Sequence, residues 1–141
     1  MAQADLIGAL TEVLKADAEA SALAGARVFG GELPGAEAAS MPRAACVLRA
    51  SGGVSLAAGS RMAHDTQRID LVCFGATSSE ASGLLAVCGA ALRGINRQLV
   101  SGCLIHWAEP AGGFFSRRDT DTKWPFAFQP FQIFHALQEA A

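Results

Sequence analysis

The stretch that decides the fold is Gln67–Ile95, QRIDLVCFGATSSEASGLLAVCGAALRGI, in which a two-residue period gives way to a helical one. Apolar side chains alternate along its first part: Ile69, Leu71 and Cys73. This alternation is typical of a strand with one face in a core. The following Thr77-Ser-Ser-Glu80 is a capping box, whose side chains satisfy backbone donors at a helix start. We therefore expect a strand over 67–75 and then a helix from 77 to 96.

The expected helix carries one continuous apolar stripe, formed by Leu84, Leu85, Val87, Cys88, Ala91, Leu92 and Ile95. A stripe of this kind is buried against a sheet in a small domain. We expect four of its residues to pack on the preceding strand and on the last strand of the chain. The four are Leu84, Val87, Cys88 and Leu92, and their expected partners are Ile69 and Leu71.

The sequence before this stretch begins with apolar residues at helical spacing, which predict a helix from Ala2 to about Ala16. Asp17 can cap a second short helical segment that reaches Leu23. Two runs rich in apolar residues then read as strands, a short one over Ala26–Phe29 and a longer one over Arg43–Ala50.

The remaining segments predict loops and further strands. Ser51–Asp65 is rich in glycine and small polar residues and reads as a long mobile hairpin connection. Cys103–Trp107 and Trp124–Leu137 are strand-rich, and the polar Asp119–Thr122 between them can turn the chain back. Pro130 cannot donate to a ladder, so we expect an edge or a bulge there, with a change in the phase of the alternation.

This order of elements predicts an α+β fold, in which an antiparallel sheet of about four strands packs under two helices and carries long hairpin loops. The length of 141 residues suits a single domain over 1–141. Hydrophobic residues make up 51% of the chain and charged residues 17%, so there is ample material for a core. The low charge has two explanations of equal weight: burial of surface between copies, or a high-GC genome that enriches alanine and glycine.

Charge and hydropathy exclude several classes of partner. The formal net charge of −2 gives no general attraction for nucleic acid, so duplex DNA is disfavoured as a direct partner. No apolar run approaches the roughly 20 residues that span a bilayer, and the first residues lack the cationic start of a signal peptide. We expect a soluble intracellular protein with no membrane contact.

The sequence predicts no catalytic, cofactor or metal site. Its four cysteines, Cys46, Cys73, Cys88 and Cys103, are far apart in sequence, form no C-x-x-C pair and are expected to pack in the core. A serine, histidine and aspartate set could include His64, but no nucleophile elbow is present. The glycine pairs at 30–31 and 52–53 lack the continuation of a phosphate-binding loop and read as turns.

Two segments are candidates for contact with partners. The run 117–123 has mixed charge and follows two phenylalanines that are unusual in an exposed hairpin. The long connection over 51–65 is of a length that is usually functional or disordered. The alternative is that both segments are merely solvated. The candidate interface residues are Arg61, His64, Phe114, Phe115, Arg117, Arg118, Asp119 and Asp121.

The order of short motifs resembles that of phage tail completion or tail terminator proteins. The motifs are Leu23–Phe29, which reads Leu-x-Gly-x-Arg-Val-Phe, then Glu32-Leu-Pro34, then Met41–Leu48, and later Arg68–Phe74 before the capped helix. The resemblance covers nearly the whole chain, and the order of the motifs carries it. Arg43 departs from the pattern, because the family commonly has an aromatic residue after the second proline.

The resemblance implies a non-enzymatic virion protein of a long-tailed phage or a gene transfer agent. Such subunits form a homo-hexameric ring that terminates the tail tube and joins it to the neck or stopper protein. It also implies assembly in the bacterial cytoplasm, a final place at the tail–neck junction, and contacts with the tail tube protein. The runner-up from a different class is a small-molecule-binding or regulatory α+β module, with an enzyme third.

Overall fold

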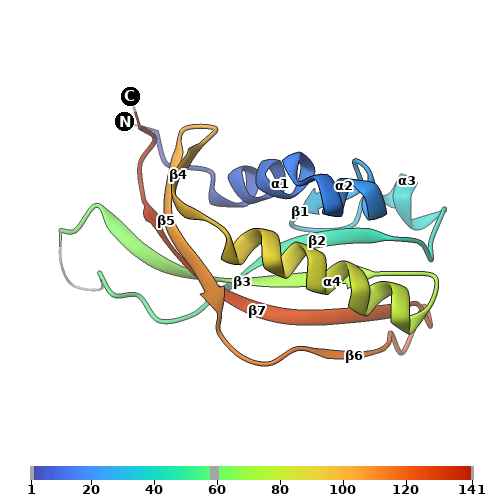
Figure 1. Ribbon diagram of the computed structural model, residues 1–141. Coiled ribbons are helices and arrows are strands. Elements are labelled where there is room, and N and C mark those ends of the chain that lie inside the picture. The colour runs from blue at the N-terminus through green and yellow to red at the C-terminus, as the bar shows by residue number, and fades with distance from the viewer. Residues whose placement is uncertain (1, 58–60, 141) are drawn as a thin grey trace.

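The computed structural model describes residues 2–57 and 61–140, and these form four helices and seven strands (Figure 1). The helices are α1 (Leu6–Ala16), α2 (Ala18–Ala24), α3 (Gly35–Ala38) and α4 (Ser78–Arg93). The strands are β1 (Val28–Gly30), β2 (Ala45–Gly52), β3 (His64–Phe74), β4 (Asn96–Val100), β5 (Cys103–Pro110), β6 (Phe115–Arg118) and β7 (Pro125–Ala136).

The strands make one mixed sheet in the order β1-β2-β3-β7-β5-β4, with β6 paired to β7. Strand β1 runs parallel to β2, and the other pairs are antiparallel. The α+β class is confirmed, but the expected four antiparallel strands under two helices are too few. The short strand expected over Ala26–Phe29 is present as β1 but runs parallel to β2, and β4 and β6 were not expected. Strands of four or five residues show too little alternation to be predicted from the sequence.

Helix starts follow the acidic and hydroxyl caps in the sequence. Asp5 accepts a hydrogen bond from the backbone N–H of Gly8, and Asp17 accepts one from Ala20. Thr77 accepts one from the N–H of Glu80, at 3.1 Å, where the capping box predicted the helix start. The first helix begins at Leu6 rather than near Ala2, because Asp5 caps it there and the preceding residues pair with the other end of the chain.

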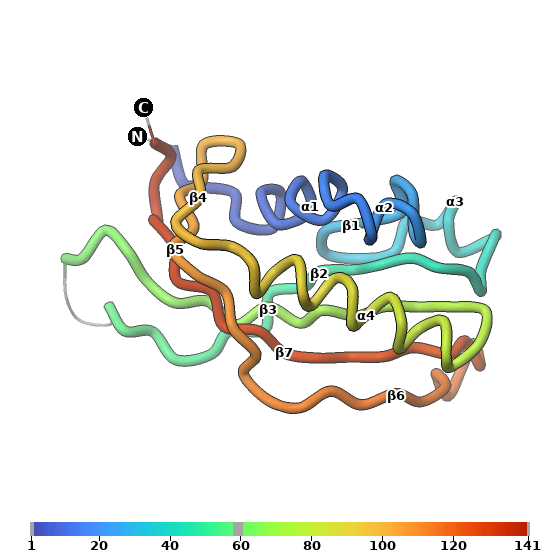
Figure 2. Tube along the Cα trace, in the orientation of Figure 1, coloured from blue at the N-terminus to red at the C-terminus, as the bar shows by residue number. Residues whose placement is uncertain are grey.

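Three of the helices, α1, α2 and α4, lie on one face of the sheet, as the ribbon and the tube both show (Figures 1 and 2). We call this the inner face. Its fully buried side chains include the expected Leu84, Cys88 and Leu92 of α4 and their partners Ile69, Leu71, Phe131 and Ile133 of the sheet. The predicted core is therefore confirmed, with Val87 only partly buried at its edge.

Strand β7 lies in the middle of the sheet, so the expectation of an edge or bulge at Pro130 is wrong. The ladder between β3 and β7 runs without a shift from Phe74 opposite Phe126 to His64 opposite Ala136. Along this side of β7, residues 125–128 pair with β6 and residues 131–135 pair with β5, so Pro130 lies between the two partners. Its carbonyl accepts a hydrogen bond from the N–H of Ala111. Because Pro130 lies at this break, its lack of an N–H removes no hydrogen bond of the ladder.

The expected change of phase in β7 is also absent, because apolar residues occupy both faces of the strand. Ala127, Phe131 and Ile133 face the helices, while Phe126 and Phe128 face the opposite, outer side of the sheet. On that outer face they join a second apolar cluster, which contains Val47, Val72, Phe74, Phe29, Leu33, Met41 and Trp124.

None of the helices in residues 2–57 and 61–140 combines the length and the apolar character needed to cross a membrane.

Candidate interaction surface

The outer face of the sheet contains a hollow of about 260 Å³ at the end where β6 meets β7. Its floor is apolar and is made by Val72, Phe74, Phe126 and Phe128. Its rim is charged and carries Arg49, Asp70, Phe115, Arg117 and Asp119. We call this feature the outer hollow. It can hold an apolar side chain on aromatic rings and pair the polar neighbours of that side chain with charges at the rim.

Three of the candidate interface residues meet at this rim. The guanidinium of Arg117 lies 5.2 Å from the ring centre of Phe115 and 5.8 Å from that of Phe126, which is within cation–π range. Asp119 accepts hydrogen bonds from the backbone N–H groups of Thr122 and Asp121, both at 2.9 Å. These two donors lower the pKa of Asp119, so this carboxylate stays charged over a wide pH range.

The other candidates of this segment do not join the outer hollow. Phe114 is 62% exposed and lies beside α4, at a second hollow of about 200 Å³ on the helix side of the sheet. Arg118 donates to the carbonyl of Lys123 at 3.1 Å and so closes the β6–β7 hairpin, where the expected turn at 119–122 is confirmed. Asp121 is exposed at the tip.

His64 lies at the opposite end of the sheet, where it pairs with Ala136, and Arg61 lies three residues before it in the connection to β3. His64 is the first residue of β3 rather than part of a loop, and its Nδ1 lies 3.0 Å from Nε2 of His106 on β5. Burial lowers the pKa of His106, and the neighbouring His64, Arg97 and His135 lower it further. The distance between the two ring nitrogens allows a hydrogen bond between the imidazoles.

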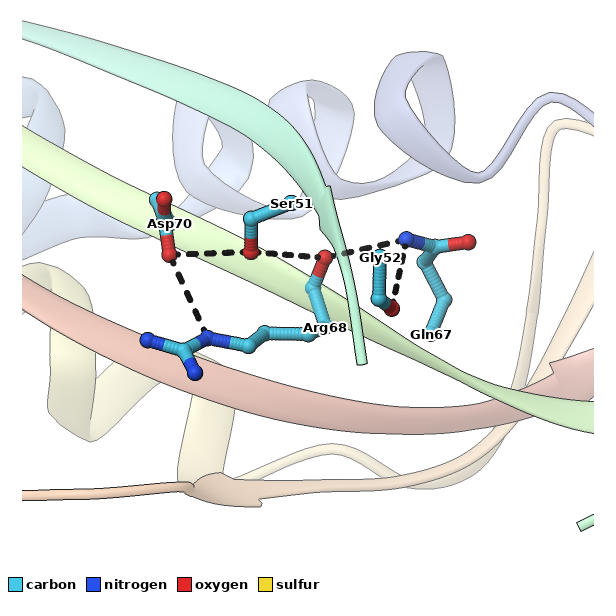
Figure 3. A network of polar contacts seen from close by, with 5 residues as sticks. All are labelled: Ser51, Gly52, Gln67, Arg68 and Asp70. Atoms are coloured by element: carbon cyan, nitrogen blue, oxygen red, sulfur yellow. Dashed lines mark hydrogen bonds and ion pairs between the residues drawn. The ribbon is translucent and has the colours of Figure 1, made fainter. Parts of the chain in front are cut away.

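The segment between β2 and β3 extends beyond the sheet, and we call its described residues, 53–57 and 61–63, the arm (Figure 1). The sequence predicted a mobile connection over 51–65, of which 58–60 lie outside the described residues. A polar network fixes the root of the arm (Figure 3): Ser51 donates to Asp70 at 3.0 Å, and Gln67 donates to the carbonyl of Gly52 at 3.1 Å. A Cβ on Gly53 would lie 2.7 Å from the Cβ of Arg68, so the chain enters the arm closely packed on β3.

Asp65 organises the arm itself. Its carboxylate accepts from the hydroxyl of Ser55 and from the backbone N–H groups of Ala57, at 3.0 Å, and Thr66, at 2.8 Å. These donors, with the Ser55 hydroxyl first among them, lower the pKa of Asp65. Because one carboxylate ties both sides of the segment together, the described part of the arm has a defined conformation.

Three cysteines that are far apart in sequence meet in the core. Cys46 and Cys73 are opposite each other on β2 and β3, and the Sγ atoms of these two and of Cys88 on α4 all lie within 4.8 Å of one another. Such a set of thiols is chemically able to bind a soft metal ion. All three side chains are fully buried, and burial raises the pKa of the Cys73 thiol well above its ordinary value. We therefore interpret them as small apolar side chains of the core.

The sequence analysis missed the floor of the outer hollow. A signal was present, since Val72, Phe74, Phe126 and Phe128 are apolar at the positions that alternate with the buried residues of β3 and β7. Strands that are apolar at both sets of positions are covered on both faces or contact a partner. The charged rim residues Arg49 and Asp70 are directly opposite each other on β2 and β3.

These features define an α+β protein with a seven-stranded mixed sheet, helices on one face and a hollowed aromatic surface on the other. No family model matches the chain, and no curated protein matches it either. Among solved structures it is similar to a chain described as "Virion of native gene transfer agent (GTA) particle". The TM-score is 0.64 at 18% identity, over 96% of this chain and 95% of that chain. The two chains share a fold over almost their entire lengths.

Proposed function

We propose that this protein is a non-enzymatic structural subunit of a virion, and that it forms a ring which terminates the tail tube of a phage or gene transfer agent and joins it to the neck. The observation that carries the proposal is the fold shared, end to end, with a chain of a gene transfer agent particle. The tail-terminator role within such a particle comes from the order of motifs in the sequence.

The surface of the molecule supports an assembling subunit over a small-molecule-binding module. The outer hollow of about 260 Å³ is open and is smaller than the roughly 300–1,000 Å³ of typical small-molecule sites. Large apolar side chains are also exposed at separate places, among them Leu23, Leu99 and Phe114. A ring subunit needs two different faces for its neighbours and further surfaces for the tube and the neck. The proposed partners are therefore other copies of the chain, the tail tube protein and the neck protein.

The test is imaging of particles from a producing strain together with deletion of the gene. We expect the subunit in a six-membered ring at the tail–neck junction, and tubes of uncontrolled length or tails without heads in the deletion strain. Re-expression of the intact chain should restore joined particles. Density for this chain anywhere other than a ring at that junction contradicts the proposal.

A further inference from the structure

The arm presents apolar side chains to solvent on a defined backbone. Val54 is 74% exposed and Leu56 is 61% exposed. The carboxylate of Asp65 fixes the backbone on both sides of them, through the hydroxyl of Ser55 and the N–H of Ala57. Little conformational entropy therefore remains to be lost when these side chains are buried by a partner. An ordered segment with exposed apolar residues has the properties of a docking element.

The outer hollow has the complementary properties. Its floor of Val72, Phe74, Phe126 and Phe128 offers aromatic and aliphatic surface, and β6 at its side is exposed along all four residues. Its rim carries the charged carboxylate of Asp119, and the arm carries the exposed guanidinium of Arg61. Seating the apolar residues of an arm on this floor thus leaves opposite charges to meet at the edge.

The arm of a molecule cannot reach the outer hollow of the same molecule. The carbonyl of Val54 accepts a hydrogen bond from the hydroxyl of Thr66, which holds this part of the arm against β3. Val72 on the floor of the hollow lies six residues further along the same strand, a separation of about 20 Å. With its backbone held at Thr66, the arm does not reach the floor of its own hollow, so another molecule must supply the arm that fills it.

We propose that the arm of one copy of this chain docks in the outer hollow of the next copy, with Val54 and Leu56 on the aromatic floor and Arg61 near Asp119. This contact is head-to-tail, because it joins two different patches of identical subunits, and repeated contacts of this kind form a ring when the rotation between neighbours closes. The inference deepens the ring proposed above and rests on it. It identifies the two patches that meet at each subunit boundary.

The experiment is cross-linking between cysteines placed on the two patches. Val54→Cys introduces a thiol on the arm, and Thr120→Cys introduces one in the exposed turn next to Asp119. The native cysteines are buried, so wild type treated with a short bismaleimide serves as the background. We expect a cross-linked dimer when the two single variants are mixed at high concentration or co-assembled in particles, and none with either variant alone.

The chain carrying both substitutions should give a ladder of cross-linked species that ends at the closed ring, since the two thiols of one molecule are too far apart to join. Leu56→Asp in this background should reduce the yield at least tenfold. Ala22→Asp, at an exposed residue on α2 outside the proposed contact, should leave the yield unchanged. Leu99→Cys on β4, in place of Thr120→Cys, should give no cross-link to the arm.

The outcomes separate this contact from the ring itself. Cross-linking in purified protein supports the contact even when particles contain no ring of this chain. A ring in particles without arm-to-rim cross-links, or a dimer formed by Val54→Cys alone, overturns the contact and leaves the ring standing. An arm that cross-links only to a different virion protein also overturns it.

Discussion

The two faces of the sheet use the same strands for different purposes. On the inner face, Ile69 and Phe131 are fully buried under α1, α2 and α4, and the packing stabilises the fold. On the outer face, Phe126 and Phe128 from the same β7 are only partly buried, and a hollow with a charged rim lies over them. The difference teaches that apolar residues on both sides of a strand do not imply two equal covering layers. Here helices cover the inner face, whereas the outer face has a small apolar cluster beside an open hollow.

The largest expected effect tests this comparison within a single strand. Phe131→Ala on the inner face should lower the free energy of unfolding by about 3–5 kcal/mol, because it removes a fully buried ring. Phe126→Ala on the outer face should cost about 1–2 kcal/mol, because part of that ring already faces solvent. Urea denaturation of both purified variants measures the difference. Equal losses for the two variants contradict the assignment of the faces.

The next effect tests the covering layer from the side of the helix. Leu92→Ala in α4 should lower the free energy of unfolding by about 2–5 kcal/mol, since this side chain is fully buried. Leu99→Ala is the matched control, because Leu99 is 57% exposed and should lose no more than about 0.5 kcal/mol. A loss below half a kilocalorie for Leu92→Ala places this side of α4 outside the core.

The inner face could be predicted from the sequence and much of the outer face could not. The caps at Asp17 and Thr77 and the stripe of α4 are local signals, and the structure confirms the elements that they predicted. The β4–β5 hairpin was missed, although Ser101 and Gly102 both have positive φ and form the two-residue turn that a hairpin prefers. A Ser-Gly pair between short apolar runs is a weak signal by comparison.

The lining of the outer hollow could be predicted only in part, because it combines residues that are far apart in the sequence. Phe115, Arg117 and Asp119 were selected by composition, and they lie together at the rim of the outer hollow. Their partners Arg49 and Asp70 come from strands far away in the sequence, so only the register of β2 and β3 brings them to the same place. The gathering of Cys46, Cys73 and Cys88 depends on the same long-range pairing. Local patterns do not contain this information.

A smaller expected effect is the pH dependence of the free energy of unfolding that arises from His135, a buried residue near the end of β7. His135 is buried, its Nδ1 lies 2.8 Å from the carbonyl oxygen of Ala136, and burial lowers its pKa below 6.5. The unfolded chain takes up a proton near pH 6.5 while the folded imidazole resists it, so stability is complete above that pH and falls as the pH drops. We expect the free energy of unfolding to decrease between pH 7 and pH 5.

Two substitutions identify the origin of this pH dependence. His135→Gln should flatten the profile between pH 7 and pH 5, and His106→Gln should remove the smaller share that comes from His106, whose pKa is also lowered. The carboxylates with lowered pKa are Glu37, Asp65 and Asp119, and since their ordinary values are 4.5 or lower, they titrate mainly below this range. A profile that stays steep in the double variant contradicts the assignment to these histidines.

The smallest expected effect on stability tests the hydrogen bonds that order the arm. Asp65→Asn replaces a carboxylate that holds Ser55 and the N–H groups of Ala57 and Thr66 by an amide with a weaker acceptor. The urea midpoint of the domain should stay close to that of wild type, since the arm contributes little to the core. Hydrogen exchange at Ala57 and Thr66 should become faster, while Asp121→Asn at the hairpin tip leaves it unchanged. The same variant tests whether docking requires an ordered arm. If it does, Asp65→Asn also lowers the yield of the arm-to-rim cross-link. An unchanged yield, together with faster exchange in the arm, shows that docking does not require this order.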